Sequence, residues 1–170
     1  APAHGYSTGK LFHVPLFTEC TRAVMEIYHP KYIIGHSVGG MTALYSQYKY
    51  PDSPVEKIVG IGAPSNSSAF MQRYQRTLKL NQKVMQGLDD YLKEKFDFNT
   101  AGFSLDRFVP DLHQQGLLIH DVLDTITPFQ DAANIHNNWP GSKIVKTEGL
   151  GHSMHQDLVN DHILKFLKDS

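Results

Sequence analysis

Residues 35–40, GHSVGG, place a serine among glycines directly after a short apolar run. Residues 31–34, which precede them, include β-branched and aromatic side chains typical of a buried strand. Residues 41–48 favour a helix with Met41, Leu44, Tyr45 and Tyr48 on one face, ended by Pro51. Ser37 is therefore predicted at a strand-to-helix corner, where the glycines two positions away on either side let backbone segments approach closely.

Ser37 has two interpretations on these residues alone. It is either a solvated side chain in a loose turn or a nucleophile held out at a turn too tight for larger neighbours. The strand, turn and helix around it are the context that a G-x-S-x-G pattern requires for the second interpretation, which we favour. A serine nucleophile also needs a base and a group that orients this base.

Three further strands are predicted at residues 55–62, 116–121 and 143–147, with helical stretches between most of them. This alternation predicts an α/β fold: a parallel sheet of about four strands, flanked by helices, in one domain over residues 1–170. A last helix is expected over residues 156–168. Its apolar side would carry Leu158, Val159, Ile163, Phe166 and Leu167.

The stretch at about residues 66–113 interrupts this alternation, because it holds no convincing strand. A connection of this length should carry structure of its own, so we expect an inserted helical subdomain. Apolar residues recur there at helical spacing: Phe70, Tyr74, Leu78, Met85, Leu88, Tyr91 and Leu92. They either pack onto the body of the protein or line a substrate pocket beneath a lid, and both can hold together.

Candidate acids and bases follow the last two predicted strands. Asp121 and Asp124 come after the third strand, and His152 and His155 come after the fourth. The carboxyl ends of parallel strands meet at one edge of the sheet, where such folds bind ligands. Asp121 lies closer to its strand end and His155 lies where the last helix should begin, so we favour Asp124 and His152 while the other pair stays open.

Three motifs in this order resemble the α/β-hydrolase superfamily, particularly its esterase- and lipase-like serine hydrolases with a helical lid. GHSVGG resembles the nucleophile elbow, HDVLDTITP the acid motif and TEGLGH the histidine loop. The resemblance implies that Ser37 is the nucleophile, Asp124 the orienting acid and His152 the base. The opening APAHGYSTG resembles the segment after the fourth strand of the family, which implies that the chain lacks the family's N-terminal strands.

The same resemblance implies where a developing oxyanion would be stabilised. The N–H of Val38, directly after the nucleophile, should be one donor, and we place the neighbouring His36 on the same substrate-binding side. The family's second donor comes from a loop after its third strand. His4 and Gly5 match the later segment instead, so they are not assigned this role.

Composition excludes several classes of partner. The net charge is −1 with both signs interspersed, so nothing indicates a nucleic-acid or anionic-membrane surface. No apolar run is long enough to span a bilayer. The single Cys20 rules out an internal disulfide and is typical of a reducing compartment, so we expect a cytoplasmic protein. No metal or cofactor is expected, because the three residues would supply the base.

The predicted activity is hydrolysis of a carboxylic ester or thioester through an acyl-Ser37 intermediate. The apolar residues of the expected lid favour a small-molecule substrate with an uncharged acyl or alkyl group. An acyltransferase or C–C hydrolase with the same three residues is one alternative. A non-catalytic binding protein, or an inactive fragment on the same fold, is the other.

By the family topology, the predicted strand order is nucleophile strand, then the strands at 55–62, 116–121 and 143–147. No segment before Lys31 is able to supply the strand that flanks the nucleophile strand on its other side. A bare sheet edge invites pairing with another chain. We therefore expect this edge to be covered by a second copy, by a separate N-terminal segment, or by residues 1–30 folded back.

Overall fold

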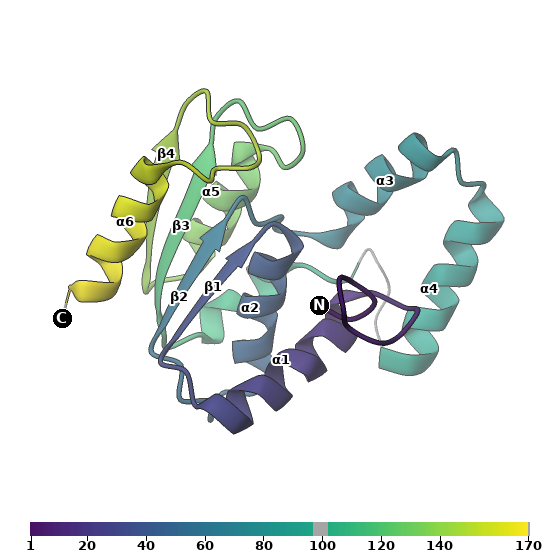
Figure 1. The fold of residues 1–170 in the computed structure, drawn as a ribbon. Helices are drawn as coiled ribbons and strands as arrows, with labels where there is room; N and C mark the ends of the chain where they lie inside the picture. Colours follow the sequence, from purple (N-terminus) through teal and green to yellow (C-terminus); the bar gives the residue numbers. More distant parts are fainter. Residues whose placement is uncertain (97–101, 170) are drawn as a thin grey trace.

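The computed structural model describes residues 1–96 and 102–169. Its centre is a parallel sheet in the order β1-β2-β3-β4, as predicted (Figure 1). The strands are β1 (Tyr32–His36), β2 (Lys57–Ile61), β3 (Gln115–Asp121) and β4 (Ser142–Thr147). Their carboxyl ends all open toward the same edge, which carries the loops that hold the candidate site.

Helices cover both faces of this sheet (Figure 1). α2 and α5 pack on one face, α6 packs on the other, and α1 packs on α2. The described helices are α1 (Val14–Tyr28), α2 (Val38–Lys49), α3 (Ser67–Leu78), α4 (Gln82–Phe96), α5 (Phe129–Asn138) and α6 (Asp157–Lys168), with two short 3₁₀ turns at Leu105–Arg107 and Val109–Asp111.

The middle parts of the two central strands are apolar because both of their faces are covered. Ile58 and Leu118 point into the cluster beneath α2 and α5. Their chain neighbours Val59 and Leu117 point the other way, into the cluster beneath α6. Successive side chains of a strand face opposite sides, so a sheet covered on both sides reads as a continuous apolar run.

α2 is buried on more than the single face that its apolar spacing predicts. Thr42, Ser46 and Gln47 are almost fully buried, whereas Tyr48 is exposed. The reason is α1, a helix that the sequence analysis does not anticipate and that covers the outer side of α2. Because these buried residues are polar, polarity does not mark the exposed side of α2, and its amphipathic pattern is weak.

The prediction for α6 holds except at one residue. Val159, Ile163 and Phe166 are buried against the sheet, but Leu158 is exposed. The end of this helix is capped from β2, where the buried Lys57 donates to the carbonyl groups of Phe166 and Leu167 at 3.0 and 3.2 Å. An ammonium group at this place satisfies carbonyls that have no partner inside the helix.

The insertion expected at residues 66–113 divides into two parts. α3 and α4 extend away from the sheet as a separate arm (Figure 1). Phe103, Leu105 and Val109 are instead fully buried in the cluster beneath α2 and α5. The last part of the expected insertion therefore belongs to the body of the protein. Residues 97–101 lie outside the described residues.

The outer edge of β1 has no pairing strand among the described residues. Residues 1–30 do not form the cover that was one of the three expected, because α1 lies on α2 instead. Tyr32 and Ile34 are 40% and 52% exposed; they lie on the same face of the sheet as Val59, which α6 covers, but outside the cluster that α6 forms. In the part of the chain that the structure describes, no helix is long and apolar enough to cross a membrane.

Candidate active site

Ser37 occupies a sharp turn between β1 and α2. Its backbone angles are φ 54° and ψ −124°, a combination that a residue with a side chain rarely adopts. The turn is held by the Ser37 N–H, which donates to the Ile61 carbonyl of β2 at 2.8 Å, and by the N–H groups of Gly40 and Met41, which donate to the Ser37 carbonyl. Backbone strain of this kind costs about 1–3 kcal/mol and is typical of functional sites.

Two glycines make this turn possible, but they are not the pair that the sequence pattern indicates. A Cβ on Gly35 would lie 2.4 Å from the Gly39 carbonyl oxygen, and one on Gly40 would lie 2.8 Å from the Ala63 Cβ. A Cβ on Gly39 would meet no atom within 4 Å. The expectation that Gly39 is needed for close approach is therefore wrong, and Gly40 has this role.

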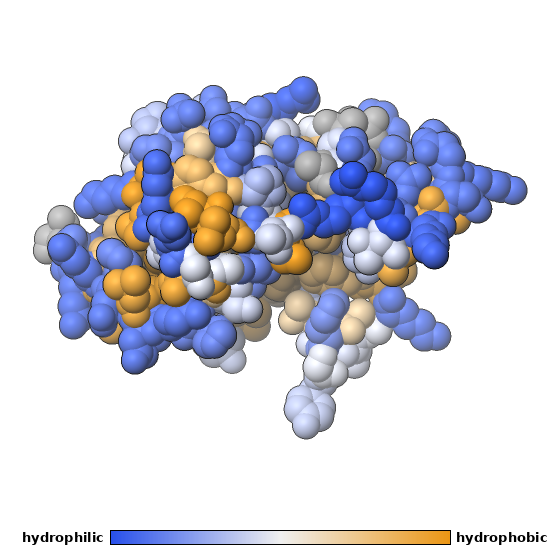
Figure 2. Space-filling view, turned by 90° about the horizontal axis from the view of Figure 1, so that it is seen from above, coloured by the Kyte–Doolittle hydropathy of each residue, from blue (hydrophilic) through white to orange (hydrophobic). Residues whose placement is uncertain are grey.

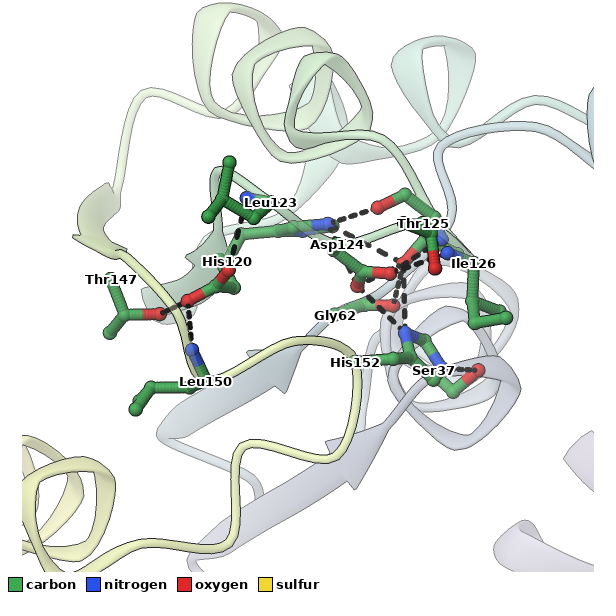
Figure 3. Close-up of polar contacts among 12 residues, drawn as sticks. Ser37, Gly62, His120, Leu123, Asp124, Thr125, Ile126, Thr147, Leu150 and His152 are labelled. Carbon is green, nitrogen blue, oxygen red and sulfur yellow. Dashed lines mark hydrogen bonds and ion pairs between the residues drawn. The ribbon is translucent and has the colours of Figure 1, made fainter.

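The loops after three strands bring Ser37, His152 and Asp124 into contact (Figure 3). His152 Nε2 lies 3.0 Å from the Ser37 Oγ, and His152 Nδ1 lies 2.7 Å from Asp124 Oδ2. The Asp124 side chain is fully buried, while that of His152 is 19% exposed. The imidazole thus contacts a hydroxyl through one nitrogen and a carboxylate through the other.

The carboxylate of Asp124 is fixed by its own loop. Its Oδ1 accepts the N–H groups of Ile126 and Thr127 at 2.7 and 2.9 Å. Burial alone would raise the pKa of Asp124. The hydrogen bonds from His152 and from residues 126–127 outweigh burial and lower the pKa, so the group is held as a carboxylate. A carboxylate beside Nδ1 keeps the proton on that nitrogen and leaves Nε2 free to accept one.

Asp121 contacts neither Ser37 nor His152. Its Oδ2 accepts from the Thr147 hydroxyl and the Leu150 N–H, both at 2.9 Å, and its Oδ1 accepts from the Leu123 N–H. The bonds from Thr147 and Leu150 tie the loop after β3 to the end of β4 and the loop after it, whereas the bond from Leu123 lies within the loop after β3. His155, the other residue left open, is exposed, and His152 occupies the place between Asp124 and Ser37.

The residues on either side of Ser37 lie differently from each other. Val38 is the first residue of α2, where N–H groups have no acceptor inside the helix and the helix dipole favours a negative charge. His36 is exposed, and its Nε2 contacts the backbone carbonyl of His152 at 2.8 Å. His36 therefore supports the loop that carries His152.

A cavity of about 420 Å³ opens beside Val38, between the body of the protein and the arm formed by α3 and α4. Its walls are mainly apolar, with Met41 from α2, Phe70 and Met71 from α3, and Leu88 from α4. Within the described residues, no Asp, Glu, Lys or Arg lines it.

The surface above the strand ends is not uniformly polar. Figure 2 looks onto this surface and shows hydrophobic side chains gathered between hydrophilic ones. The loop after β3 contributes three exposed apolar residues beside Asp124, namely Val122, Leu123 and Ile126. Among the residues that the structure describes, no group of three His, Cys, Asp or Glu side chains could hold a metal ion.

Two further residues of this region are not among the predicted site residues. Thr127 is 2% exposed, and its hydroxyl lies at the junction of Asp124, His152 and Gly62. His120 is fully buried on β3, and its Nε2 contacts the Thr127 carbonyl at 2.8 Å. Only the Thr-Pro pair that ends the acid motif could have drawn attention to Thr127.

Comparison with known proteins agrees with this geometry. The sequence model of the alpha/beta hydrolase fold family matches residues 2–142. The chain belongs to the α/β-hydrolase fold family. A search of curated proteins found no match to the sequence.

Solved structures of the same fold include enzymes of several names. An esterase from Exiguobacterium antarcticum is 18% identical, with a TM-score of 0.72 over 97% of this chain and 78% of the esterase. The monoacylglycerol lipase of Paleococcus ferrophilus is 19% identical, with a TM-score of 0.70 over 98% and 80%. A bromoperoxidase from Bacillus anthracis is 19% identical, with a TM-score of 0.74 over 97% and 78%. At these identities the likeness establishes the α/β-hydrolase fold, and the reaction has to be inferred from the site.

Proposed function

We propose that this protein is a serine hydrolase that cleaves a carboxylic ester or thioester through an acyl-Ser37 intermediate. One observation carries the proposal: the His152 ring contacts the Ser37 hydroxyl through Nε2 and the buried Asp124 carboxylate through Nδ1. A serine hydroxyl becomes a useful nucleophile when a base can take its proton and an acid orients that base.

In the proposed first step, Ser37 Oγ attacks the carbonyl carbon of the ester while its proton passes to His152 Nε2. The negative charge moves to the carbonyl oxygen, where the Val38 N–H at the start of α2 stabilises it. The tetrahedral intermediate then expels the alcohol or thiol, which takes the proton from His152. A water molecule repeats the sequence on the acyl-enzyme, releasing the acid and restoring Ser37.

Asp124 has a supporting role in these steps. It keeps the proton of the resting imidazole on Nδ1 and stabilises the imidazolium that forms when Nε2 is protonated. The hydrogen bonds that Oδ1 receives from residues 126–127 fix the direction of this carboxylate. Preorganised groups of this kind need no rearrangement during the reaction.

The cavity beside Val38 favours an uncharged acyl or alkyl group. Its lining is mainly apolar, so a charged group placed there would lose its hydration without an Asp, Glu, Lys or Arg side chain to pair with among the described residues. We therefore propose small esters with an aliphatic acyl chain as substrates, and α3 and α4 as the lid whose inner side contacts that chain.

Hydrolysis of p-nitrophenyl butyrate tests this proposal with two matched histidine variants. Ser37→Ala and His152→Ala should each lower turnover on the order of 10⁴–10⁶-fold. His155→Ala removes a nearby exposed imidazole and should leave turnover within about threefold of the parent, as is usual for a surface substitution. Activity of Ser37→Ala within tenfold of the parent contradicts the proposal. Acyl-enzyme that forms but is released only by an added alcohol or amine assigns an acyltransferase instead.

A further inference from the structure

The Thr127 hydroxyl lies where the loops after β2, β3 and β4 meet. Its Oγ1 is 2.9 Å from Asp124 Oδ2, 3.0 Å from the Gly62 carbonyl oxygen and 3.2 Å from His152 Nδ1. The residue is 2% exposed, so water does not compete for these contacts. Figure 3 shows that Gly62, Asp124 and His152, the three residues that this hydroxyl contacts, lie close together.

The chemistry of the neighbours decides how this hydroxyl is used. His152 Nε2 has to accept from Ser37, so Nδ1 carries the ring proton, and the Thr127 oxygen can only accept from it. His120 Nε2 lies 3.4 Å from the hydroxyl, but it donates its proton to the Thr127 carbonyl and so cannot accept one. The single hydroxyl proton can then go to Asp124 Oδ2 or to the Gly62 carbonyl. Asp124 Oδ2 already accepts from His152, whereas within the described residues the Gly62 carbonyl has no other hydrogen-bond donor.

We propose that Thr127 is a positioning residue, whose hydroxyl donates to the Gly62 carbonyl and accepts from His152 Nδ1–H alongside Asp124. This inference rests on the proposed hydrolase function. During the reaction the imidazole becomes positively charged, and an oxygen lone pair directed at Nδ1–H stabilises this charge without itself being ionised. The hydroxyl also links the imidazole to the end of β2.

The surroundings hold Thr127 in the position that this role requires. Its N–H donates to Asp124 Oδ1 at 2.9 Å, and His120 Nε2 contacts its carbonyl at 2.8 Å. Gly62 has a φ of 56°, and a Cβ on it would lie 3.4 Å from the His152 ring and 2.9 Å from Met154 Cε. The backbone on both sides of the hydroxyl is therefore closely packed and fixes its position.

Two variants separate the hydroxyl from the shape of the side chain. Thr127→Val keeps the volume and removes the hydroxyl, while Thr127→Ser keeps the hydroxyl and removes the methyl group. With p-nitrophenyl butyrate, Thr127→Val should lower kcat about tenfold or more with KM little changed, because a hydrogen bond to a charged group is lost. Thr127→Ser should stay within about threefold of the parent, since it keeps that bond.

Thr18→Val is the matched control. Thr18 is fully buried in α1, and its hydroxyl has no hydrogen-bond partner among the described residues. The same substitution at this place should leave kcat unchanged. If Thr127→Val does not fold, Thr127→Ala gives the same comparison with Thr127→Ser.

A second readout does not depend on turnover. The His152 Nδ1–H proton can be observed by NMR, identified by its loss in His152→Ala, and its exchange with water measured. We expect faster exchange in Thr127→Val than in the parent and in Thr127→Ser. If the parent is inactive but exchange is faster only in Thr127→Val, the result contradicts the hydrolase proposal and supports the position assigned to Thr127. The inference is overturned if Thr127→Val changes neither kcat nor the exchange rate. It is also overturned if Thr127→Ser lowers kcat as much as Thr127→Val does.

Discussion

Asp121 and Asp124 lie three residues apart after the same strand, yet their carboxylates have different surroundings. Asp124 contacts His152, whereas Asp121 accepts from Thr147 and Leu150, which join the loop after β3 to β4 and the loop after it, and from Leu123 in its own loop. Burial would raise the pKa of Asp121, but the N–H groups of Leu150 and Leu123 and the Thr147 hydroxyl outweigh it and lower the pKa. We infer that Asp124 serves the reaction and Asp121 serves the stability of the loops.

The lowered pKa of Asp121 predicts a pH-dependent contribution to stability. A carboxyl group whose pKa is lower in the folded state than its unfolded value of about 3.9 stabilises the fold above that value. The contribution is lost as the pH falls through the folded pKa. Asp121→Asn should therefore melt at a lower temperature than the parent at pH 7. The difference between their melting temperatures, measured by calorimetry, should narrow toward pH 3. A constant difference across this range contradicts the assignment.

Asp124→Asn is the matched variant for activity. The amide no longer favours the imidazole tautomer with its proton on Nδ1, so turnover should fall about 10⁴-fold while the fold is kept. Asp121→Asn should lower turnover far less, because it does not touch the imidazole. The identity of the two aspartates did not distinguish them; the distance from the strand end and the resemblance to the acid motif favoured Asp124, which is the one that contacts His152.

At the scale of the elements, the turn from β1 to α2 sets the geometry of the nucleophile. Gly35 and Gly40 allow the two backbones to approach, whereas Gly39 has open space beside it. A matched pair of substitutions tests this difference. Gly35→Ala should lower the free energy of unfolding by several kcal/mol, because its methyl group overlaps a backbone carbonyl that cannot move aside.

Gly39→Ala should instead leave the stability unchanged or raise it by about 1 kcal/mol, since alanine favours the helix that begins there. Urea unfolding of both variants measures the two free energies. Equal losses in the free energy of unfolding would show that Gly39, like Gly35, tolerates no side chain, and would contradict the distinction between them.

The four strands could be predicted within two residues because β-branched and apolar runs mark strands that are buried. α1 could not, since much of its outer surface is apolar too, with Val24, Ile27 and Tyr28 exposed. Thr127 was also beyond reach. Its hydroxyl acquires a role only where three loops from distant parts of the chain meet, and the sequence alone does not show this meeting.

At the scale of the whole molecule, β1 is the least protected part of the sheet. α6 covers the side chains of β2 and β3 but does not reach Tyr32 and Ile34. Backbone groups at the outer edge of β1 have no pairing strand in residues 1–96 and 102–169. A bare edge flanked by apolar side chains favours association with another strand. Two of the three expected covers remain, a second copy of this chain and a separate N-terminal segment, and we propose that a second copy pairs there in solution.

Sedimentation velocity at increasing protein concentration checks this association. The parent should shift toward a dimer in the micromolar range, and Ile34→Lys should remain monomeric, because a charge beside the edge opposes strand pairing. Ile27→Lys, on the exposed side of α1, is the control for added charge. A parent that stays monomeric at all concentrations contradicts the proposed pairing.

Covalent labelling with a fluorophosphonate tests the central claim most directly, because this reagent reacts with an activated serine hydroxyl. Of the 11 serines in the chain, only Ser37 contacts the imidazole of His152 among the residues that the structure describes. We predict one phosphonyl group per chain by intact mass, located on Ser37 by peptide mapping, and no label in Ser37→Ala or His152→Ala. No adduct in the folded parent, or an adduct on another serine, would contradict the assignment of Ser37 as the nucleophile.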